Sequence, residues 1–308
     1  MRFMKKLFKN KVFAVFAAVG CTLLWGTAFP FIKSGYAAFS IAEGDIGSKL
    51  LFAGLRFSIA GLLVLAALWI SSRRVVLPSK NELPPILLLG GVQTFAQYLF
   101  TYIGLGLTGG ANTSVITACS AFFTVLAAPI FFRNDRLTAL KILGCVLGFG
   151  GVLLINGGAE LEARGLLGDG LILCSTVCAA AGNIIAKRKT SGIDPITLTA
   201  YQLLFGGSLL AVLGLVTGGR LDLTVIKGDL ILLWLALVSA VAFAVWTALL
   251  KYHPAGKISV FNLLVPVIGT VLSGVMLGEN ILRPALPISL LLISAGIAAV
   301  NISKEKPD

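Results

Sequence analysis

The sequence predicts an all-α polytopic membrane protein with about ten transmembrane helices in two inverted five-helix repeats. The 308 residues are 57% hydrophobic and only 12% charged, and their mean hydropathy is +0.96, which lies outside the range of soluble domains. Apolar stretches of roughly 18 to 24 residues recur along the whole chain, each long enough to cross the membrane as a helix. A weak internal repeat provides the third observation.

The apolar stretches are continuous rather than alternating, which favours helices over a β-barrel. The predicted spans are residues 12–33, 49–71, 84–105, 110–132, 138–156, 166–187, 196–217, 229–251, 257–278 and 284–302. The predicted divisions are a basic cytoplasmic segment (1–11), a first repeat (12–156), an external linker (157–165), a second repeat (166–302) and a cytoplasmic tail (303–308). The connections leave no room for a soluble catalytic or receptor domain. We interpret the first span as an uncleaved helix rather than a secretory signal.

The distribution of lysine and arginine predicts the orientation. With both termini in the cytoplasm, about 18 of the 25 basic residues fall on the cytoplasmic side and about 6 on the other. This bias accounts for the net charge of +12 without a nucleic-acid partner. We expect a multi-pass protein of a bacterial plasma membrane. The five cysteines are interpreted as apolar packing residues, and no metal or cofactor is expected.

The internal repeat has a period near 145 residues. LRFSIAGLL aligns with YQLLFGGSLL, which sets Arg56 against Gln202. The segment from Gly109 to Asp135 aligns with the segment that ends at Glu279. Because five helices is an odd number, the second half must enter the membrane from the opposite side, as in many secondary transporters.

Three segments carry a resemblance to a known family: LWGTAFPFIKSG, the LRF of the second span, and PAGKISVFNLLVPVIGTVLSGVMLGEN. They resemble the drug/metabolite transporter superfamily, in particular its EamA-type members, across essentially the whole chain. The resemblance implies a ten-helix inverted-repeat carrier with cytoplasmic termini, most often an exporter of small metabolites such as amino acids. The first half departs from the pattern at FFRNDRL and at Phe122, which aligns with Pro266.

Helix-disrupting residues mark candidate hinges in two spans. Gly26, Pro30 and Lys33 share one face of the first span, and proline removes a backbone donor and frees a carbonyl one turn back. Pro266 is the third candidate hinge, beside Gly26 and Pro30. The alternative for Gly26 and Pro30 is ordinary close packing, and Lys33 is interpreted as an interfacial anchor.

Arg56 lies several residues inside the second span, where an unpaired guanidinium is costly. We interpret the spans as free of intramembrane carboxylates. The partner of Arg56 is therefore expected to be a loop acid such as Glu43 or Asp45, a helix C-terminus, or the carboxylate or phosphate of a substrate.

Polar and aromatic side chains at helical spacing indicate the inward faces. The candidate substrate cavity consists of Trp25, Gln93, Gln97, Tyr98, Thr117, Asn183, Tyr201, Gln202, Trp246 and Asn262. The alternative is that these stripes only hold helices together through close approach and hydrogen bonds. Amides paired with aromatic residues suit a neutral or zwitterionic metabolite with an apolar part.

The leading functional hypothesis is a secondary transporter that exports an amino acid or related compound by alternating access. Uniport or exchange is favoured over proton antiport through a buried acid. Carriers of phosphorylated metabolites or nucleotide sugars are the runner-up, followed by a noncatalytic membrane subunit and a membrane-embedded enzyme. No GxxxxGK[ST] loop is present, which excludes an ATP-driven pump for this chain. Gly144 and Gly148 form a GxxxG that predicts a packing face or the interface of a homodimer.

Overall fold

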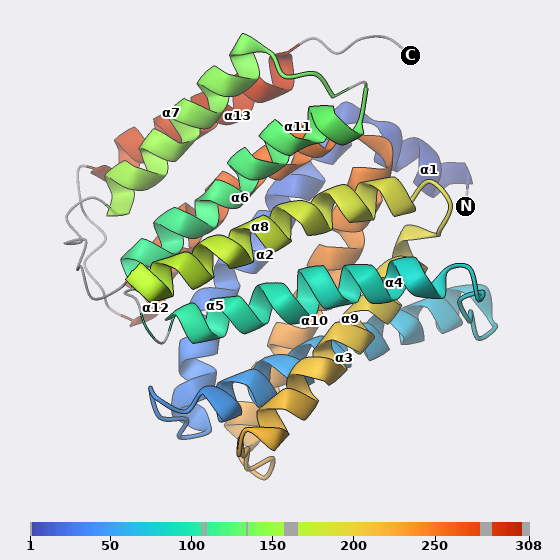
Figure 1. The fold of residues 1–308 in the computed structure, drawn as a ribbon, viewed down its shortest axis with the longest axis vertical. Coiled ribbons are helices and arrows are strands. Elements are labelled where there is room, and N and C mark those ends of the chain that lie inside the picture. Colours follow the sequence, from blue (N-terminus) through green and yellow to red (C-terminus); the bar gives the residue numbers. More distant parts are fainter. Residues whose placement is uncertain are drawn as a thin grey trace.

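Each of the ten predicted spans forms a helix or a pair of helices in a computed structural model of the protein, which describes residues 2–105, 107, 110–133, 135–156, 166–277 and 285–303 (Figure 1). A short helix, α1 (Arg2–Lys9), precedes them. The first half contains α2 (Lys11–Ala38), α3 (Ile46–Ser72), α4 (Leu83–Leu89), α5 (Gln97–Leu105), α6 (Gly110–Phe131) and α7 (Ala139–Asn156). The second half contains α8 (Leu166–Lys189), α9 (Pro195–Val216), α10 (Ile226–Tyr252), α11 (Ala255–Ser259), α12 (Leu264–Leu277) and α13 (Ala285–Ile302).

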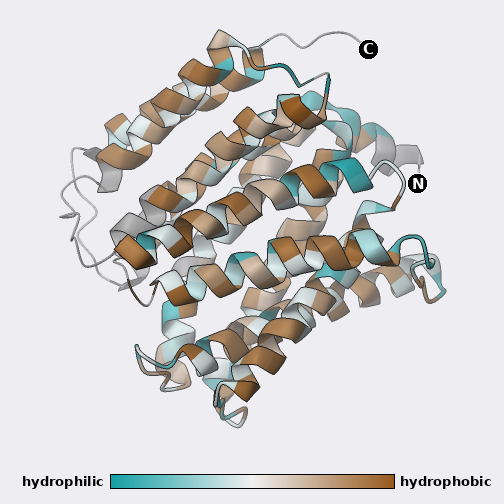
Figure 2. Ribbon diagram, viewed as in Figure 1, coloured by the Kyte–Doolittle hydropathy of each residue, from teal (hydrophilic) through white to brown (hydrophobic). Residues whose placement is uncertain are grey.

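The length and hydropathy of these helices define a polytopic membrane protein. Six helical stretches are long and apolar enough to cross a membrane, and four shorter apolar stretches match the remaining predicted spans. Figure 2 shows hydrophobic residues along the bodies of the helices and hydrophilic residues gathered in loops and at helix ends. The prediction of an all-α bundle is confirmed.

Corresponding helices of the two halves pack against each other, as inverted repeats require. The second helices of the halves, α3 and α9, form the most extensive contact, and the fifth helices, α7 and α13, form the next (Figure 1). Glycines allow this approach: a Cβ on Gly54 of α3 would lie 2.2 Å from the nitrogen of Ala211 on α9. The chain is therefore two five-helix units that enclose a shared interior.

The GxxxG of α7 packs inside the chain. A Cβ on Gly144 would lie 2.5 Å from the carbonyl oxygen of Gly296 on α13, and a Cβ on Gly296 would lie 2.5 Å from the oxygen of Gly144. A Cβ on Gly148 would meet Leu263 at 2.4 Å. The packing prediction is correct, whereas this face is not available for a homodimer because α13 already covers it.

The helix α1 and the end of α13 both contact the region where α10 ends and α11 begins. His253 follows the end of α10, and its Nε2 lies 2.8 Å from the carbonyl oxygen of Phe8 in α1. Lys257 donates to the carbonyl oxygens of Asn301 and Ser303 at 3.1 and 2.9 Å. These contacts bind both terminal segments to one end of the second half.

Two of the spans are interrupted by irregular helical turns. Between α4 and α5, residues Gly90–Ala96 form a π-helical segment that contains Gln93. Between α11 and α12, residues Val260–Leu263 form a 3₁₀ segment, and Pro266 follows one turn later. Such irregular turns occur frequently at functional sites. In contrast, α2 continues through Pro30 without a break.

Three carboxylates of the described residues bear on the predicted absence of acids from the membrane interior. Asp169 and Asp229 fall inside the predicted spans, but each occupies the first turn of its helix, where the helix dipole favours negative charge. Asp135, after α6, is buried and forms an ion pair with buried Lys141 of α7. Its second oxygen accepts a hydrogen bond of 3.0 Å from the backbone of Gly256 at the start of α11. This ion pair therefore connects the two halves.

Candidate functional site

One buried face of α10 organises the interior. Ser239, Phe243 and Trp246 follow at i, i+4 and i+7, so they lie on one side of the helix, and all three are buried. The rise of an α-helix separates Ser239 from Trp246 by about 10 Å along the axis. A polar contact lies at each end of this face, with aromatic rings between them.

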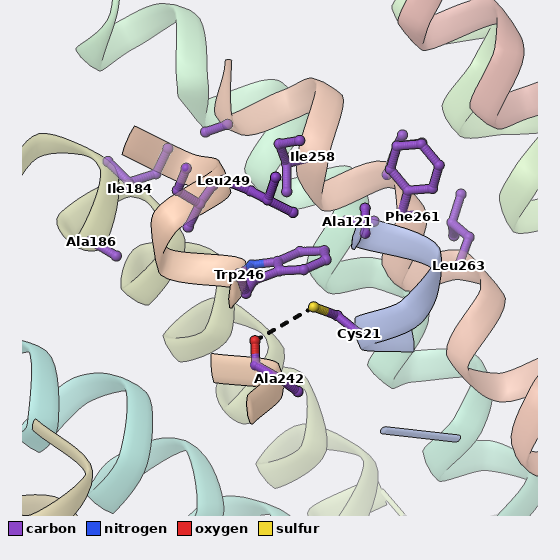
Figure 3. Close-up of a cluster of buried hydrophobic side chains, with 14 of the residues drawn as sticks. Cys21, Ala121, Ile184, Ala186, Ala242, Trp246, Leu249, Ile258, Phe261 and Leu263 are labelled. Carbon is purple, nitrogen blue, oxygen red and sulfur yellow. Dashed lines mark hydrogen bonds between the residues drawn. The ribbon is translucent and has the colours of Figure 1, made fainter. Parts of the chain in front are cut away.

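At the Trp246 end, the polar contact is a short chain of hydrogen bonds. The indole Nε1 of Trp246 donates to Oδ1 of Asn183 at 3.1 Å, and Nδ2 of Asn183 donates to Oγ of Ser259 at 3.2 Å. These bonds join α10, α8 and α11. Figure 3 shows the Trp246 ring among apolar side chains that include Cys21 and Ile258, where the Cys21 thiol donates to the carbonyl oxygen of Ala242 at 3.6 Å.

At the Ser239 end, the polar contact involves a buried cation. Nε of Arg56 donates to Oγ of Ser239 at 2.9 Å, and the guanidinium lies 5.0 Å from the ring centre of Phe57. Arg56 is only 2% exposed. Within the part of the chain that the structure describes, no carboxylate lies within ion-pair distance of Arg56.

Neither of the two loop acids named as examples pairs with Arg56. Asp45 caps the start of α3 by accepting a hydrogen bond of 2.8 Å from the backbone of Ser48, and Glu43 is exposed in the loop before it. Eleven residues separate Asp45 from Arg56, which is about 16 Å along a helix. Arg56 is thus held by the neutral hydroxyls of Ser239 and Tyr102 and by the ring of Phe57.

Aromatic rings fill the space between the two polar ends. The Trp25 ring lies 5.4 Å from Phe243 and 5.0 Å from Trp246, both in edge-to-face geometry. Phe57 lies 6.2 Å from Phe243 and 4.3 Å from Tyr98. The structure therefore brings the predicted residues Trp25, Tyr98 and Trp246 into one aromatic layer.

The first half contributes a second polar contact through its π-helical segment. Oε1 of Gln202 accepts a hydrogen bond of 2.7 Å from Oγ1 of Thr94, and Gln202 is fully buried. Gln93 is buried beside it, and a Cβ on Gly182 of α8 would lie 2.7 Å from the Cβ of Gln93. Arg56 and Gln202 are aligned in the two repeats, so one half presents a cation where the other presents an amide.

Several buried polar atoms in this region lack a hydrogen-bond partner among the described residues. They are Nε1 of Trp25, Nε2 of Gln202 and Oδ1 of Asn262. A buried polar atom without a partner costs free energy, and such atoms mark places where water or a ligand binds. Trp25, Gln202 and Asn262 thus retain capacity for a ligand.

The remaining predicted residues make other contacts. The hydroxyl of Tyr201 donates to the carbonyl oxygen of Val76 at 2.9 Å, in the loop between α3 and α4, while its ring packs against the buried core. Gln97 and Thr117 are half-buried, and their part in a cavity stays a prediction. Gly26 packs tightly, because a Cβ there would lie 2.3 Å from Cγ2 of Ile268 on α12.

Sequence reasoning missed the phenylalanines of the aromatic layer. Phe57 and Phe243 are buried in the interior, but phenylalanine is equally common on lipid-facing surfaces, so periodicity alone does not identify them. It also missed the burial of Asp135. Among the described residues, no cluster of three histidine, cysteine, aspartate or glutamate side chains could hold a metal ion.

The fold and this interior define a class of protein: a polytopic membrane protein whose two inverted halves enclose a polar and aromatic core. The chain belongs to the EamA-like transporter family, which matches residues 12–157 and 166–302. It is 30% identical over 294 residues to a "Probable amino-acid metabolite efflux pump" of Escherichia coli (strain K12), covering 89% of this chain and 88% of that protein. It is also 28% identical over 308 residues to the uncharacterized transporter YvbV of Bacillus subtilis (strain 168), covering 97% and 94%.

The fold also matches a protein of known crystal structure. The TM-score is 0.78 over 94% of this chain and 96% of the other, at 19% sequence identity. Because the identity is low, this match concerns the fold alone. Membership of the family and the ten-helix fold together establish a membrane transporter of the drug/metabolite type.

Proposed function

We propose that this protein exports a small carboxylate-bearing metabolite, an amino acid or a related compound, by alternating access. Family membership supports a small-molecule substrate. Two relatives, from Escherichia coli (strain K12) and Salmonella typhimurium (strain LT2), are named "Probable amino-acid metabolite efflux pump" and are 30% and 29% identical to this chain. Each alignment covers about nine-tenths of both proteins.

The observation that carries the proposal is the burial of Arg56 without a carboxylate partner in the described chain. A guanidinium inside a membrane protein is costly unless an anion or several acceptors meet it. Ser239 and the Tyr102 hydroxyl, both neutral, meet part of its five N–H donors. A substrate carboxylate would accept two parallel hydrogen bonds from the guanidinium, which is the strongest and most selective arrangement available to arginine.

The aromatic layer suits the remainder of such a substrate. Phe57 lies against Arg56, and ring contacts continue from it through Phe243 to Trp25, so an apolar part extending from the carboxylate would meet aromatic rings. The unpartnered Oδ1 of Asn262 and the Trp246–Asn183 pair then offer polar contacts. The arrangement favours a metabolite that has a carboxylate at one end and an apolar or mixed body.

Alternating access would use the irregular turns that border this interior. The π-helical segment Gly90–Ala96 lies in the third helix of the first half, and the 3₁₀ segment Val260–Leu263 lies in the fourth helix of the second half. Interrupted helices in transporters absorb conformational change and present backbone groups to the substrate. We assign the pivot of the second half to Val260–Leu263 with Pro266, and we retain Gly26 and Pro30 as candidate hinges of α2.

The test is efflux from proteoliposomes loaded with labelled amino acids and related metabolites, with and without a proton gradient. Selective, saturable efflux above protein-free liposomes is the expected result, and its dependence on the gradient separates facilitated transport from proton coupling. Transport confined to phosphorylated sugars or nucleotide sugars would replace the proposed substrate class. Absence of efflux for every compound would contradict the carrier proposal and favour a noncatalytic membrane subunit.

A further inference from the structure

A long apolar groove lies on the outer surface of the bundle, away from the interior site. It has a volume of about 640 Å³ and lies between α4, α6 and α8. This volume falls within the range of roughly 300–1,000 Å³ that is typical of small-molecule sites. Its floor includes Ala180 and Ile184, which are 4% and 5% exposed, and its rims include Leu88 and Ile130, which are 50% and 80% exposed.

Two cations close one end of the groove. Arg188 and Lys189, in the last turn of α8, line it together with apolar residues that extend back to Val177. In the part of the chain that the structure describes, neither cation lies within ion-pair distance of a carboxylate. Figure 2 shows this end of α8 as a hydrophilic patch beside hydrophobic stretches of α4 and α6.

The length of the groove corresponds to one leaflet of a bilayer. Twelve residues separate Val177 from Lys189, which is about 18 Å along a helix, and one leaflet contributes about 15 Å of hydrocarbon. The apolar part therefore reaches from the basic end to the region of the bilayer midplane. Basic pockets between transmembrane helices are sites where anionic lipid headgroups bind.

We propose that this groove binds one anionic phospholipid, with an acyl chain along Ala180 and Ile184 and the phosphate between Arg188 and Lys189. The positive charge of Arg188 and Lys189 favours an anionic headgroup. The small side chains of Ala127 and Ala181 leave room for the acyl chain. The lipid would bridge α6 of the first half and α8 of the second. Because Asn183 lies on the adjacent, buried side of α8, the lipid would also support the helix that holds the Trp246 contact.

The test measures lipid retained by the purified, delipidated protein after mixing with equal amounts of phosphatidylglycerol and phosphatidylcholine, using native mass spectrometry. Wild-type protein should retain one phosphatidylglycerol, and Arg188→Gln with Lys189→Gln should reduce its retention about ten-fold relative to phosphatidylcholine. The matched control, Arg74→Gln with Lys80→Gln, removes two exposed charges from the loop between α3 and α4 and should retain the lipid.

Two further experiments distinguish the contribution of the acyl chain from that of the lipid headgroup. Ala127→Phe should obstruct the groove and abolish retention while leaving both cations in place, and glycerol phosphate should not compete, since it lacks acyl chains. Equal retention by the wild type and the Arg188 and Lys189 double variant would overturn the proposal. Equal loss in the control variant, or displacement by glycerol phosphate, would overturn it as well, because either would show attraction by charge alone.

Discussion

Arg56 and Ser239 lie 183 residues apart in the chain, yet their side chains share a buried hydrogen bond of 2.9 Å. Arg56 belongs to the second helix of the first half and Ser239 to the third helix of the second half, so the bond crosses between the repeats. A motion that exchanges the conformations of the two halves must alter this contact. The bond therefore joins the two repeats at the residue that we propose as the substrate contact.

Removal of the charge at Arg56 should not unfold the protein. If the guanidinium serves the substrate rather than the fold, Arg56→Gln removes a desolvated charge and retains a donor for Ser239, so the free energy of unfolding should be unchanged or higher. Unfolding of the purified variant in detergent measures this. A loss of about 3–5 kcal/mol would instead identify Arg56 as a structural element.

The Trp246–Asn183 hydrogen bond should couple α10 to α8 energetically. Trp246→Phe leaves Oδ1 of Asn183 without its donor, and Asn183→Ala leaves both Trp246 and Ser259 without a partner. A double-mutant cycle on the free energy of unfolding should give a coupling of about 0.6–1.7 kcal/mol, the range for hydrogen bonds between membrane helices. If the two substitutions change the free energy of unfolding additively, the hydrogen bond does not couple the two helices.

A side chain at position 26 should destabilise the protein unless the side chain of Ile268 is made smaller. The Cβ of Gly26→Ala would lie 2.3 Å from Cγ2 of Ile268, so the substitution should destabilise the contact of α2 with α12 by about 1–3 kcal/mol. Gly20→Ala is the matched control, since a Cβ there meets no atom within 4 Å. Combining Gly26→Ala with Ile268→Ala should recover part of the loss, and failure to recover would show that the contact is not the cause.

The ion pair between Asp135 and Lys141 should stabilise the fold only as a pair. Asp135→Asn keeps an acceptor for Gly256 but leaves Lys141 buried beside a neutral group, which should cost about 3–5 kcal/mol. Adding Lys141→Met removes the unpaired charge and should restore much of that stability. Thermal unfolding of the wild type and the two variants checks the order, and a double variant less stable than Asp135→Asn would contradict it.

The helices themselves could be predicted closely because hydrophobic length sets their extent. The predicted span 196–217 is the helix Pro195–Val216, and the predicted span 84–105 matches Leu83–Leu105. The sequence did not predict the π-helical turn at Gly90–Ala96. That turn depends on contacts with α8 and α9, which no local pattern contains.

The site could be predicted only in part. Helical periodicity indicates which face of a helix points inward, but it does not give the depth of a residue in the bundle or the residue that it contacts. It placed Arg56 and Trp246 inward, where both are buried. Its assignment of Tyr201 to the cavity stays a prediction, because the ring packs against the buried core while the hydroxyl bonds to Val76 in a loop. It also proposed Asp45 as a partner of Arg56, although eleven residues of helix α3 separate the two side chains.

The most direct test of the account compares wild-type protein and Arg56→Gln in proteoliposome efflux of labelled amino acids over a range of concentrations. The account predicts saturable efflux by the wild type and a fall in kcat/KM of at least about ten-fold in the variant, which corresponds to about 1.4 kcal/mol of lost substrate interaction. The fall should be absent for the corresponding amino-acid amides, if the wild type carries them. Equal efflux of the acids by both proteins would contradict the assignment of Arg56 to the substrate carboxylate.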